Sequence, residues 1–289
     1  MPSPLHLKSH AVSIGAGAPL CVMAGLNVLE DRDLALKVGA HLQAVCARLE
    51  LPYIFKASFD KANRSSIHAY RGPGLEAGLE ILADVKSTLG VPVITDYHTA
   101  GQAAPVAEVA DVIQVPAFLC RQTDLVVAGA RAVAARGGWL HVKKAQFLAP
   151  WDCKNITAKI AEAAPEASVI LCERGASFGY NNLTVDMLAI PAMKALGVPV
   201  TIDATHAVQL PGADPRTAGS STGGRREGVA VIAAAAVASG ADGVFLEFHP
   251  EPDKALCDGP SCLPLAAAEP LLARCKAIHA LAAEGDIPV

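Results

Sequence analysis

Charged and amide side chains follow a series of short apolar runs in this chain, each near the carboxyl end of its run. In chain order they are Asn27, Lys56, Lys61, Asp96, His98, Gln114, Lys143, Glu173, Arg174, Asp203, His206, Glu247 and His249. Further cations, Arg64, Arg121 and Lys144, lie close to the same positions. Cations that converge on one pocket repel one another unless the ligand is strongly negative, and Arg and Lys bind phosphates and carboxylates. The sequence therefore predicts a site for small phosphorylated ligands, and two ligands explain so many cations better than one.

Several other classes of protein are disfavoured by composition and motifs. The phosphate-binding pattern GxxxxGK[ST] is absent from the sequence, which disfavours a nucleoside triphosphate. A net charge of −4 at pH 7 gives no basic surface for nucleic acid. The longest apolar run, residues 229–238, is about half as long as a membrane span. The 8 cysteines are scattered without a CxxC pair and are expected to be free thiols in a reducing compartment. We expect a cytoplasmic enzyme with no nucleic-acid or membrane partner.

The elements that must position these side chains alternate between short apolar runs and helical patterns. We expect strands at residues 20–24, 53–56, 93–96, 112–115, 140–143, 169–172, 200–203 and 244–247. We expect helices at residues 31–49, 75–89, 124–136, 154–163, 186–196, 225–238 and 266–283, and a short connection around residues 102–108 after the third strand. Eight such alternations predict an α/β protein, a (β/α)₈ TIM barrel formed by one domain over residues 1–289. Residues 1–14 form an N-terminal extension that we expect at the barrel floor. A doubly wound open sheet is the alternative, disfavoured because no GxGxxG follows the first run.

In a barrel of this kind the active site lies at the carboxyl ends of the strands, where the polar residues occur. The long connections at residues 207–224 and 248–264 follow strands, and we expect lids or binding loops there, the first mobile without ligand. Lys143 and Lys144 are adjacent on one strand, so only one of them can face the pocket. Arg174 could have a structural role instead of binding ligand, as the partner of Glu173 or another carboxylate in an ion pair.

Residues 56–68, KASFDKANRSSIH, resemble the signature of the 3-deoxy-D-manno-octulosonate 8-phosphate synthase family. The resemblance continues at residues 70–74, 111–124, 142–147, 173–182, 203–206, 223–225, 247–250 and 257–261, and so covers nearly the whole chain. It implies a transferase of lipopolysaccharide biosynthesis, a barrel fold and usually a homotetramer. The implied reaction condenses phosphoenolpyruvate with D-arabinose 5-phosphate and water, giving the eight-carbon 3-deoxy keto sugar phosphate and inorganic phosphate.

The resemblance also implies which residues form the site. The implied catalytic residues are Asn27, Lys61, Asp96, Lys143, His206, Glu247 and Asp258. The implied substrate-binding residues are Lys56, Asn63, Arg64, Ser65, Gln114, Arg121 and Arg174. Lys61, Lys143 and Arg174 resemble the residues that bind phosphoenolpyruvate, and the segment 63–65 resembles the sugar-phosphate site. Arg121 resembles an arginine that reaches the sugar phosphate from a neighbouring subunit. Which of His206, Glu247 and Asp258 activates water is left open.

Asn27 stands where metal-dependent members of the family carry a cysteine, which binds a divalent ion together with His, Glu and Asp. An amide oxygen is a neutral, weak ligand compared with a thiolate. We therefore predict activity without metal and no cofactor. The alternative is loose divalent binding by His206, Glu247 and Asp258, because residues 146–152 and 206–212 resemble metal-dependent members.

Three other functions remain as alternatives. The related 3-deoxy-arabino-heptulosonate 7-phosphate synthase uses erythrose 4-phosphate, but its sugar-phosphate loop is closer to KPRTS than to the KANRSS at residues 61–66. An aldolase would use Lys143 to form a Schiff base. A non-catalytic barrel that binds sugar phosphates would need no set of His206, Glu247 and Asp258.

Overall fold

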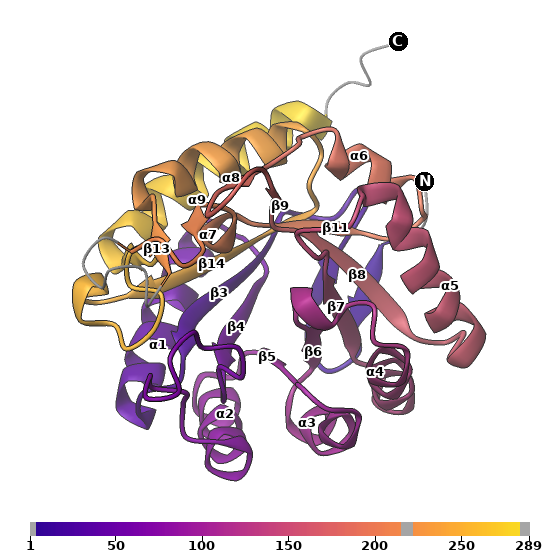
Figure 1. Cartoon of the computed structure of the whole chain (residues 1–289), viewed down its shortest axis with the longest axis horizontal. Helices are drawn as coiled ribbons and strands as arrows, with labels where there is room; N and C mark the ends of the chain where they lie inside the picture. Colours follow the sequence, from indigo (N-terminus) through magenta and orange to yellow (C-terminus); the bar gives the residue numbers. More distant parts are fainter. Residues whose placement is uncertain (1–3, 215–221, 284–289) are drawn as a thin grey trace.

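The computed structural model describes residues 4–214 and 222–283. Within these residues, eight parallel strands form a closed barrel with helices around it (Figure 1). In chain order they are β3 (Cys21–Val28), β4 (Tyr53–Ser58), β5 (Val93–Asp96), β6 (Val112–Val115), β7 (Trp139–Lys143), β8 (Ser168–Glu173), β11 (Val200–Asp203) and β14 (Gly243–His249). Each strand pairs with the next along the chain, and β14 closes the ring by pairing with both β11 and β3. The predicted (β/α)₈ barrel is confirmed, and the open sheet is wrong.

The helices cover the outside of the barrel. They are α1 (Arg32–Arg48), α2 (Leu75–Leu89), α3 (Ala103–Val109), α4 (Thr123–Arg136), α5 (Lys154–Ala163), α6 (Ala189–Lys194), α8 (Val229–Ala238) and α9 (Ala268–Ala283), with a single turn α7 (Ala204–Ala207) after β11. Capping residues determine where several of these helices begin and end. Asp31 caps α1 by accepting a 2.8 Å hydrogen bond from the backbone N–H of Leu34. Gly90 and Gly137 end α2 and α4 at φ of 64° and 70°, a left-handed conformation that glycine adopts without strain.

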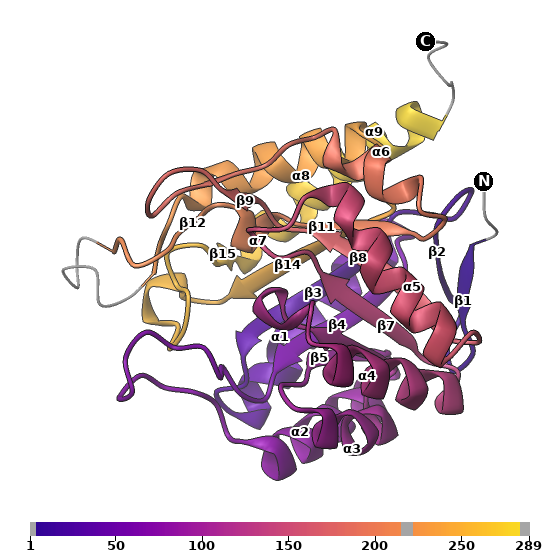
Figure 2. The same ribbon diagram turned by 45° about the vertical axis from the view of Figure 1, so that its right-hand side comes forward.

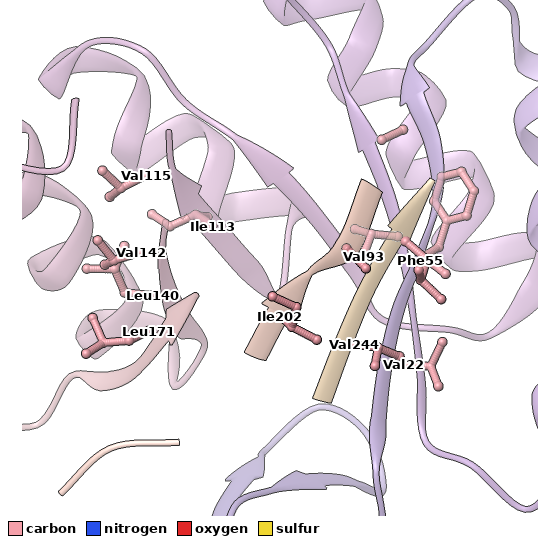
Figure 3. Close-up of a cluster of buried hydrophobic side chains, with 14 of the residues drawn as sticks. Val22, Phe55, Val93, Ile113, Val115, Leu140, Val142, Leu171, Ile202 and Val244 are labelled. Carbon is pink, nitrogen blue, oxygen red and sulfur yellow. The ribbon is translucent and has the colours of Figure 1, made fainter. Parts of the chain in front are cut away.

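Side chains alternate between the two faces of each barrel strand, so the barrel contains two apolar regions. The outward residues pack against the helices. Figure 3 shows ten of them, Val22, Phe55, Val93, Ile113, Val115, Leu140, Val142, Leu171, Ile202 and Val244. The inward residues of the lower barrel, among them Met23, Ile54, Trp139 and Phe245, form a second buried cluster. The lower barrel is therefore filled with side chains.

The N-terminal hairpin closes this lower end. Its strands β1 (Leu5–Leu7) and β2 (Val12–Ile14) pair antiparallel, and Leu7 and Ile14 are buried in the inner cluster. Between the strands, Ser9 Oγ donates a 2.6 Å hydrogen bond to Asp111. Figure 2 shows the hairpin at the opposite end from the loops that follow β4, β11 and β14. The expected closure of the barrel floor is confirmed for residues 4–14, and residues 1–3 lie outside the described part.

Short strand pairs shape the loops at the other end. They are β9 (Ala176–Ser177) with β10 (Leu183–Thr184), β12 (Gln209–Leu210) with β13 (Gly223–Gly224), and β15 (Leu263–Pro264) beside the end of β14. Residues 215–221, part of the connection 207–224 that was predicted to be mobile, lie outside the described residues. Among the described helices, none combines the length and apolar character needed to cross a bilayer.

Candidate active site

The inward face changes from apolar to polar toward the carboxyl ends of the strands. On several strands, a polar side chain lies in the barrel two residues beyond an inward apolar residue. Buried examples are Lys56 after Ile54 on β4, Asp96 after Ile94 on β5, Gln114 after Val112 on β6 and Glu247 after Phe245 on β14. Side chains alternate between the two faces of each strand. Polar residues that are far apart in the sequence therefore lie at the same height inside the barrel.

A cavity of 750 Å³ opens above this level, a size that accommodates two small phosphorylated ligands. The predicted site residues that line it are Lys61, Asn63, Arg64, Ser65, Asp96, Gln114, Lys143, Arg174, His206 and Asp258. Asn27, Lys56 and Glu247 do not line the cavity, but they are hydrogen-bonded directly beneath it. Arg121 is exposed and does not line the cavity of its own chain.

Asn27 joins the two carboxylates nearest to it. Its amide Nδ2 donates to Glu247 Oε2 at 2.5 Å and to Asp258 Oδ2 at 3.2 Å. A side chain at Gly25 would collide with the backbone of Lys56, so glycine allows β3 to approach β4 closely at this level. Asp258 has a φ of 49°, in the left-handed region, and lines the cavity. The amide N–H groups therefore lie between two anions, where they offset part of their repulsion.

This arrangement does not fit a resident divalent ion. In the part of the chain that the structure describes, no group of three His, Cys, Asp or Glu side chains is arranged to hold one. Both neighbours of the Asn27 amide are acceptors, so its NH₂ must face them, and its Oδ1 is buried without a partner among the described residues. Turning the amide would direct its oxygen at two carboxylates. Asn27 thus takes the place of a cation between Glu247 and Asp258 instead of completing a ligand set.

Lys56 supports the same cluster from below. Its Nζ donates to the backbone oxygens of Leu26 and Asn27 and to Glu247 Oε1 at 3.1, 2.8 and 2.5 Å. Burial lowers the pKa of Lys56 to about 8, against the opposing effect of Glu247. Burial would raise the pKa of Glu247, but His206, Lys56 and Lys61 lower it to about 2. The pair is therefore ionised near neutral pH.

Asp203, at the end of β11, holds two predicted catalytic residues at once. Its Oδ2 accepts from Lys143 Nζ at 2.5 Å and contacts His206 Nδ1 at 2.7 Å. Burial would raise the pKa of Asp203, but His206 and Lys143 keep it well below its ordinary value. This contact leaves His206 Nε2 facing Glu247 Oε2 at 3.5 Å and Asp258 Oδ2 at 3.7 Å. His206 is thereby oriented toward the cavity by its neighbour three residues earlier.

Arg174 is buried in the cavity wall with part of its guanidinium unused. Nη2 donates to Gln209 Oε1 at 3.0 Å, and Gln209 in turn donates to Asp258 at 3.0 Å. Nη1 is buried and has no partner among the described residues. The alternative ion pair with Glu173 is wrong, because the Glu173 carboxylate lies 3.5 Å from Lys144 Nζ, outside the cavity. Of the adjacent lysines, Lys143 lines the cavity and Lys144 faces away, as the alternation requires.

The loop after β4 brings Lys61 and the residues 63–65 over the cavity. Burial would lower the pKa of Lys61, but Glu247 and Asp96 raise it above its ordinary value. Asp96 accepts from His98 Nε2 at 3.0 Å, while its Oδ1 is buried without a described partner. An unused carboxylate oxygen beside a cavity is suited to accept a hydroxyl hydrogen bond.

The carboxylates of this site offset its cations more than the sequence indicated. Lys56 and Lys143 pair with Glu247 and Asp203. Lys61 is under the charges of Glu247 and Asp96, so the unbound site is far less positive than its cations alone imply. Gln209 and His141 were not predicted. A single glutamine in a loop and a single histidine in an apolar strand carry no spacing signal that would identify them.

The parallel barrel and its mouth define the class of protein: a (β/α)₈ barrel with a cavity at the carboxyl ends of its strands, lined by lysine and arginine beside carboxylates. The chain belongs to the DAHP synthetase I family, whose model matches residues 4–280.

Three relatives share the name 2-dehydro-3-deoxyphosphooctonate aldolase. The chain is 54% identical to the one from Marinobacter nauticus over 276 residues, 96% of this chain and 95% of the relative. It is 55% identical to the one from Pelobacter propionicus over 270 residues, 93% of this chain and 96% of the relative. It is 55% identical to the one from Desulfosudis oleivorans over 274 residues, 94% and 95% of the two chains. The resemblance drawn from residues 56–68 and the later motifs is confirmed.

Proposed function

We propose that this chain condenses phosphoenolpyruvate with D-arabinose 5-phosphate and water, releasing 3-deoxy-D-manno-octulosonate 8-phosphate and inorganic phosphate. The observation that carries the proposal is the buried, partly unpartnered guanidinium of Arg174 in a cavity that Lys61 and Lys143 also line. A buried guanidinium nitrogen without an acceptor is suited to a phosphate or carboxylate oxygen. The relatives above are named for an eight-carbon phosphorylated acid, which supports the same substrates.

The reaction needs two negatively charged substrates held in contact. In the proposal, Lys61, Lys143 and Arg174 bind the carboxylate and phosphate of the enol substrate. Residues 63–65 bind the phosphate of the sugar, and the free Oδ1 of Asp96 accepts one of its hydroxyl groups. Pairing the charges and fixing the geometry lower the barrier to attack of the enol C3 on the aldehyde carbon.

Water completes the reaction at C2. As the C3–carbon bond forms, water oxygen bonds to C2, and one water proton reaches the former aldehyde oxygen. In the resulting hemiketal phosphate, the bond between C2 and the phosphate oxygen breaks. The C2 hydroxyl gives its proton to the leaving phosphate, and its oxygen becomes that of the ketone. We propose that the water lies at His206 Nε2, close to the carboxylates of Glu247 and Asp258. These three groups pass the proton, and Asn27 keeps the two carboxylates together.

The alternatives have less support. A Schiff base at Lys143 requires an unprotonated amine, but its Nζ lies 2.5 Å from the buried carboxylate of Asp203. The heptulosonate reaction is disfavoured by the KANRSS segment at residues 61–66 and by the name that the relatives share.

Phosphate release is the direct test. We expect turnover with phosphoenolpyruvate plus arabinose 5-phosphate and much slower turnover with erythrose 4-phosphate. A preference for the four-carbon sugar, or release with neither, would overturn the proposal. Borohydride treatment in the presence of substrate should trap no adduct on Lys143.

We also propose a homotetramer in the cytoplasm, in which Arg121 binds the sugar phosphate of a neighbouring subunit. Its support is that Arg121 is exposed and outside its own cavity, whereas Phe118, three residues earlier, lines that cavity and is 54% exposed. All 8 cysteines are buried free thiols, which suits a reducing compartment. Arg121→Ala should raise KM for the sugar phosphate about tenfold, as expected for one bond to a charged group, with KM for the enol substrate unchanged. Equal changes in both constants, or a monomer in sedimentation, would contradict this arrangement.

A further inference from the structure

His141 lies inside the barrel, one level below the cavity. It is on β7 between the inward residues Trp139 and Lys143, and its side chain is completely buried. Burial and the neighbouring charge of Lys143 lower the pKa of His141 to about 3, so the ring is neutral under ordinary conditions. A polar ring at this depth must be hydrogen-bonded at both nitrogens or destabilise the fold.

Both nitrogens have partners. Nδ1 lies 3.0 Å from Gln114 Oε1, and Nε2 lies 2.8 Å from Thr201 Oγ1. A neutral imidazole has one N–H and one lone pair, so one contact is donated and the other accepted. The partners therefore determine which nitrogen carries the proton.

The Gln114 amide distinguishes the two tautomers. Its Oε1 faces His141 Nδ1 at 3.0 Å, and an amide oxygen can only accept, so Nδ1–H is the donor. Nε2 then accepts the hydroxyl proton of Thr201 at 2.8 Å, a shorter contact than the 3.4 Å between Oγ1 and the backbone oxygen of Leu171. With its oxygen held from below, Gln114 turns its NH₂ toward the cavity that it lines. The opposite tautomer would present an oxygen to incoming anions.

The ring is also held by packing. It stacks on Phe245 with the centroids 5.9 Å apart and 8° between the planes. The Nζ of Lys143 lies 4.0 Å from the centroid of the same Phe245 ring. His141 thus shares one aromatic neighbour with a lysine of the proposed site, and its neutrality avoids a second buried charge beside that lysine.

We propose that His141 is a positioning residue for the enol phosphate site, acting as the Nδ1–H tautomer that orients the Gln114 amide to donate to the bound anion. This inference rests on the proposed function, since the anion is taken to be phosphoenolpyruvate.

A double-mutant cycle on the affinity for phosphoenolpyruvate, measured by calorimetry, tests the inference. His141→Phe keeps a ring against Phe245 but removes both hydrogen bonds, and Gln114→Ala removes the amide. Each single variant should weaken binding about tenfold, the effect of one hydrogen bond to a charged group. Because His141 acts through Gln114, the double variant should bind no more weakly than Gln114→Ala. A further tenfold loss in the double variant would overturn the inference.

Two further measurements separate positioning from a structural role. Affinity for arabinose 5-phosphate should be unchanged in His141→Phe, whereas a disordered barrel would lose both ligands. Nitrogen-15 spectra of the histidine-labelled wild type should show a protonated Nδ1, an unprotonated Nε2 and no titration across the neutral range, which needs no variant to fold. The reverse tautomer would overturn the inference. Phosphate release from both substrates by the wild type tests the proposed function separately, because the affinity cycle requires no turnover.

Discussion

Replacing Arg174 by methionine should separate ligand binding from stability. Arg174 is 5% exposed, and its guanidinium Nη1 has no partner among the described residues. One or two hydrogen bonds from a charged donor to a bound anion contribute together about 3 kcal/mol, or roughly a hundredfold in affinity. Arg174→Met should therefore raise KM for phosphoenolpyruvate about a hundredfold.

The ligand-free protein should respond differently. The variant loses the bond to Gln209, about 1 kcal/mol, but it also removes a charge whose pKa is lowered by burial. The free energy of unfolding without ligand should thus stay within about 1 kcal/mol of the wild type or rise. Phosphoenolpyruvate at about 100 times the wild-type Kd stabilises the wild type by about 2.7 kcal/mol. The same concentration is near the Kd of the variant and stabilises it by only about 0.4 kcal/mol.

Thermal unfolding with and without phosphoenolpyruvate, together with steady-state phosphate release, measures both effects. Arg48→Met is the matched control, because Arg48 is exposed at the end of α1 and pairs with Glu269 at 2.6 Å, outside the cavity. It should leave KM and ligand stabilisation unchanged. If Arg174→Met keeps wild-type stabilisation by phosphoenolpyruvate, the assignment of Arg174 to the anion is refuted.

Three other predictions address the metal, the buried carboxylate and the second lysine. Treatment with EDTA should leave turnover within about twofold, since Asn27 fills the position between the carboxylates; loss restored by Mn²⁺ would contradict this. The pKa of Glu247 is lowered from 4.5 to about 2. Ionised Glu247 therefore contributes about 3 kcal/mol to the free energy of unfolding above pH 4.5, and this contribution is lost on acidification toward pH 2. In urea unfolding, the free energy of unfolding of Glu247→Gln should lack this part of the pH dependence. The same pH dependence in the variant and the wild type would refute the prediction. Lys144→Met leaves Glu173 buried without its ion pair and should cost about 3 kcal/mol in urea unfolding with KM unchanged; altered substrate KM would place Lys144 in the site.

The barrel was predictable because each buried parallel strand is a short apolar run bounded by polar or turn residues. All eight predicted strands coincide with observed ones, and the structure extends several of them by a few residues, as at β3 and β14. The predicted helix at residues 186–196 is shorter, since α6 spans Ala189–Lys194. The two-residue strand pairs at the mouth were not predicted, because two residues contain no periodicity.

The site was predictable where a residue follows directly from strand position. Side chains alternate between the two faces of a strand. This alternation alone predicts that Lys143, at the end of β7, and Lys144, the next residue, point to opposite sides of the barrel wall. Contacts between loops are set by tertiary packing, so the bonds that Asp258 accepts from Asn27 and Gln209 had no sequence signal. Arg121 could not be tested within one chain, because the site proposed for it belongs to a neighbour.

The hairpin beneath the barrel closes one end of it in the part of the chain that the structure describes. Leu7, Ile14 and Trp139 are buried together at the floor, so among the described residues the cavity opens toward the loop-bearing end. A compound bound among the loops therefore narrows the route to the side chains at the bottom of the cavity.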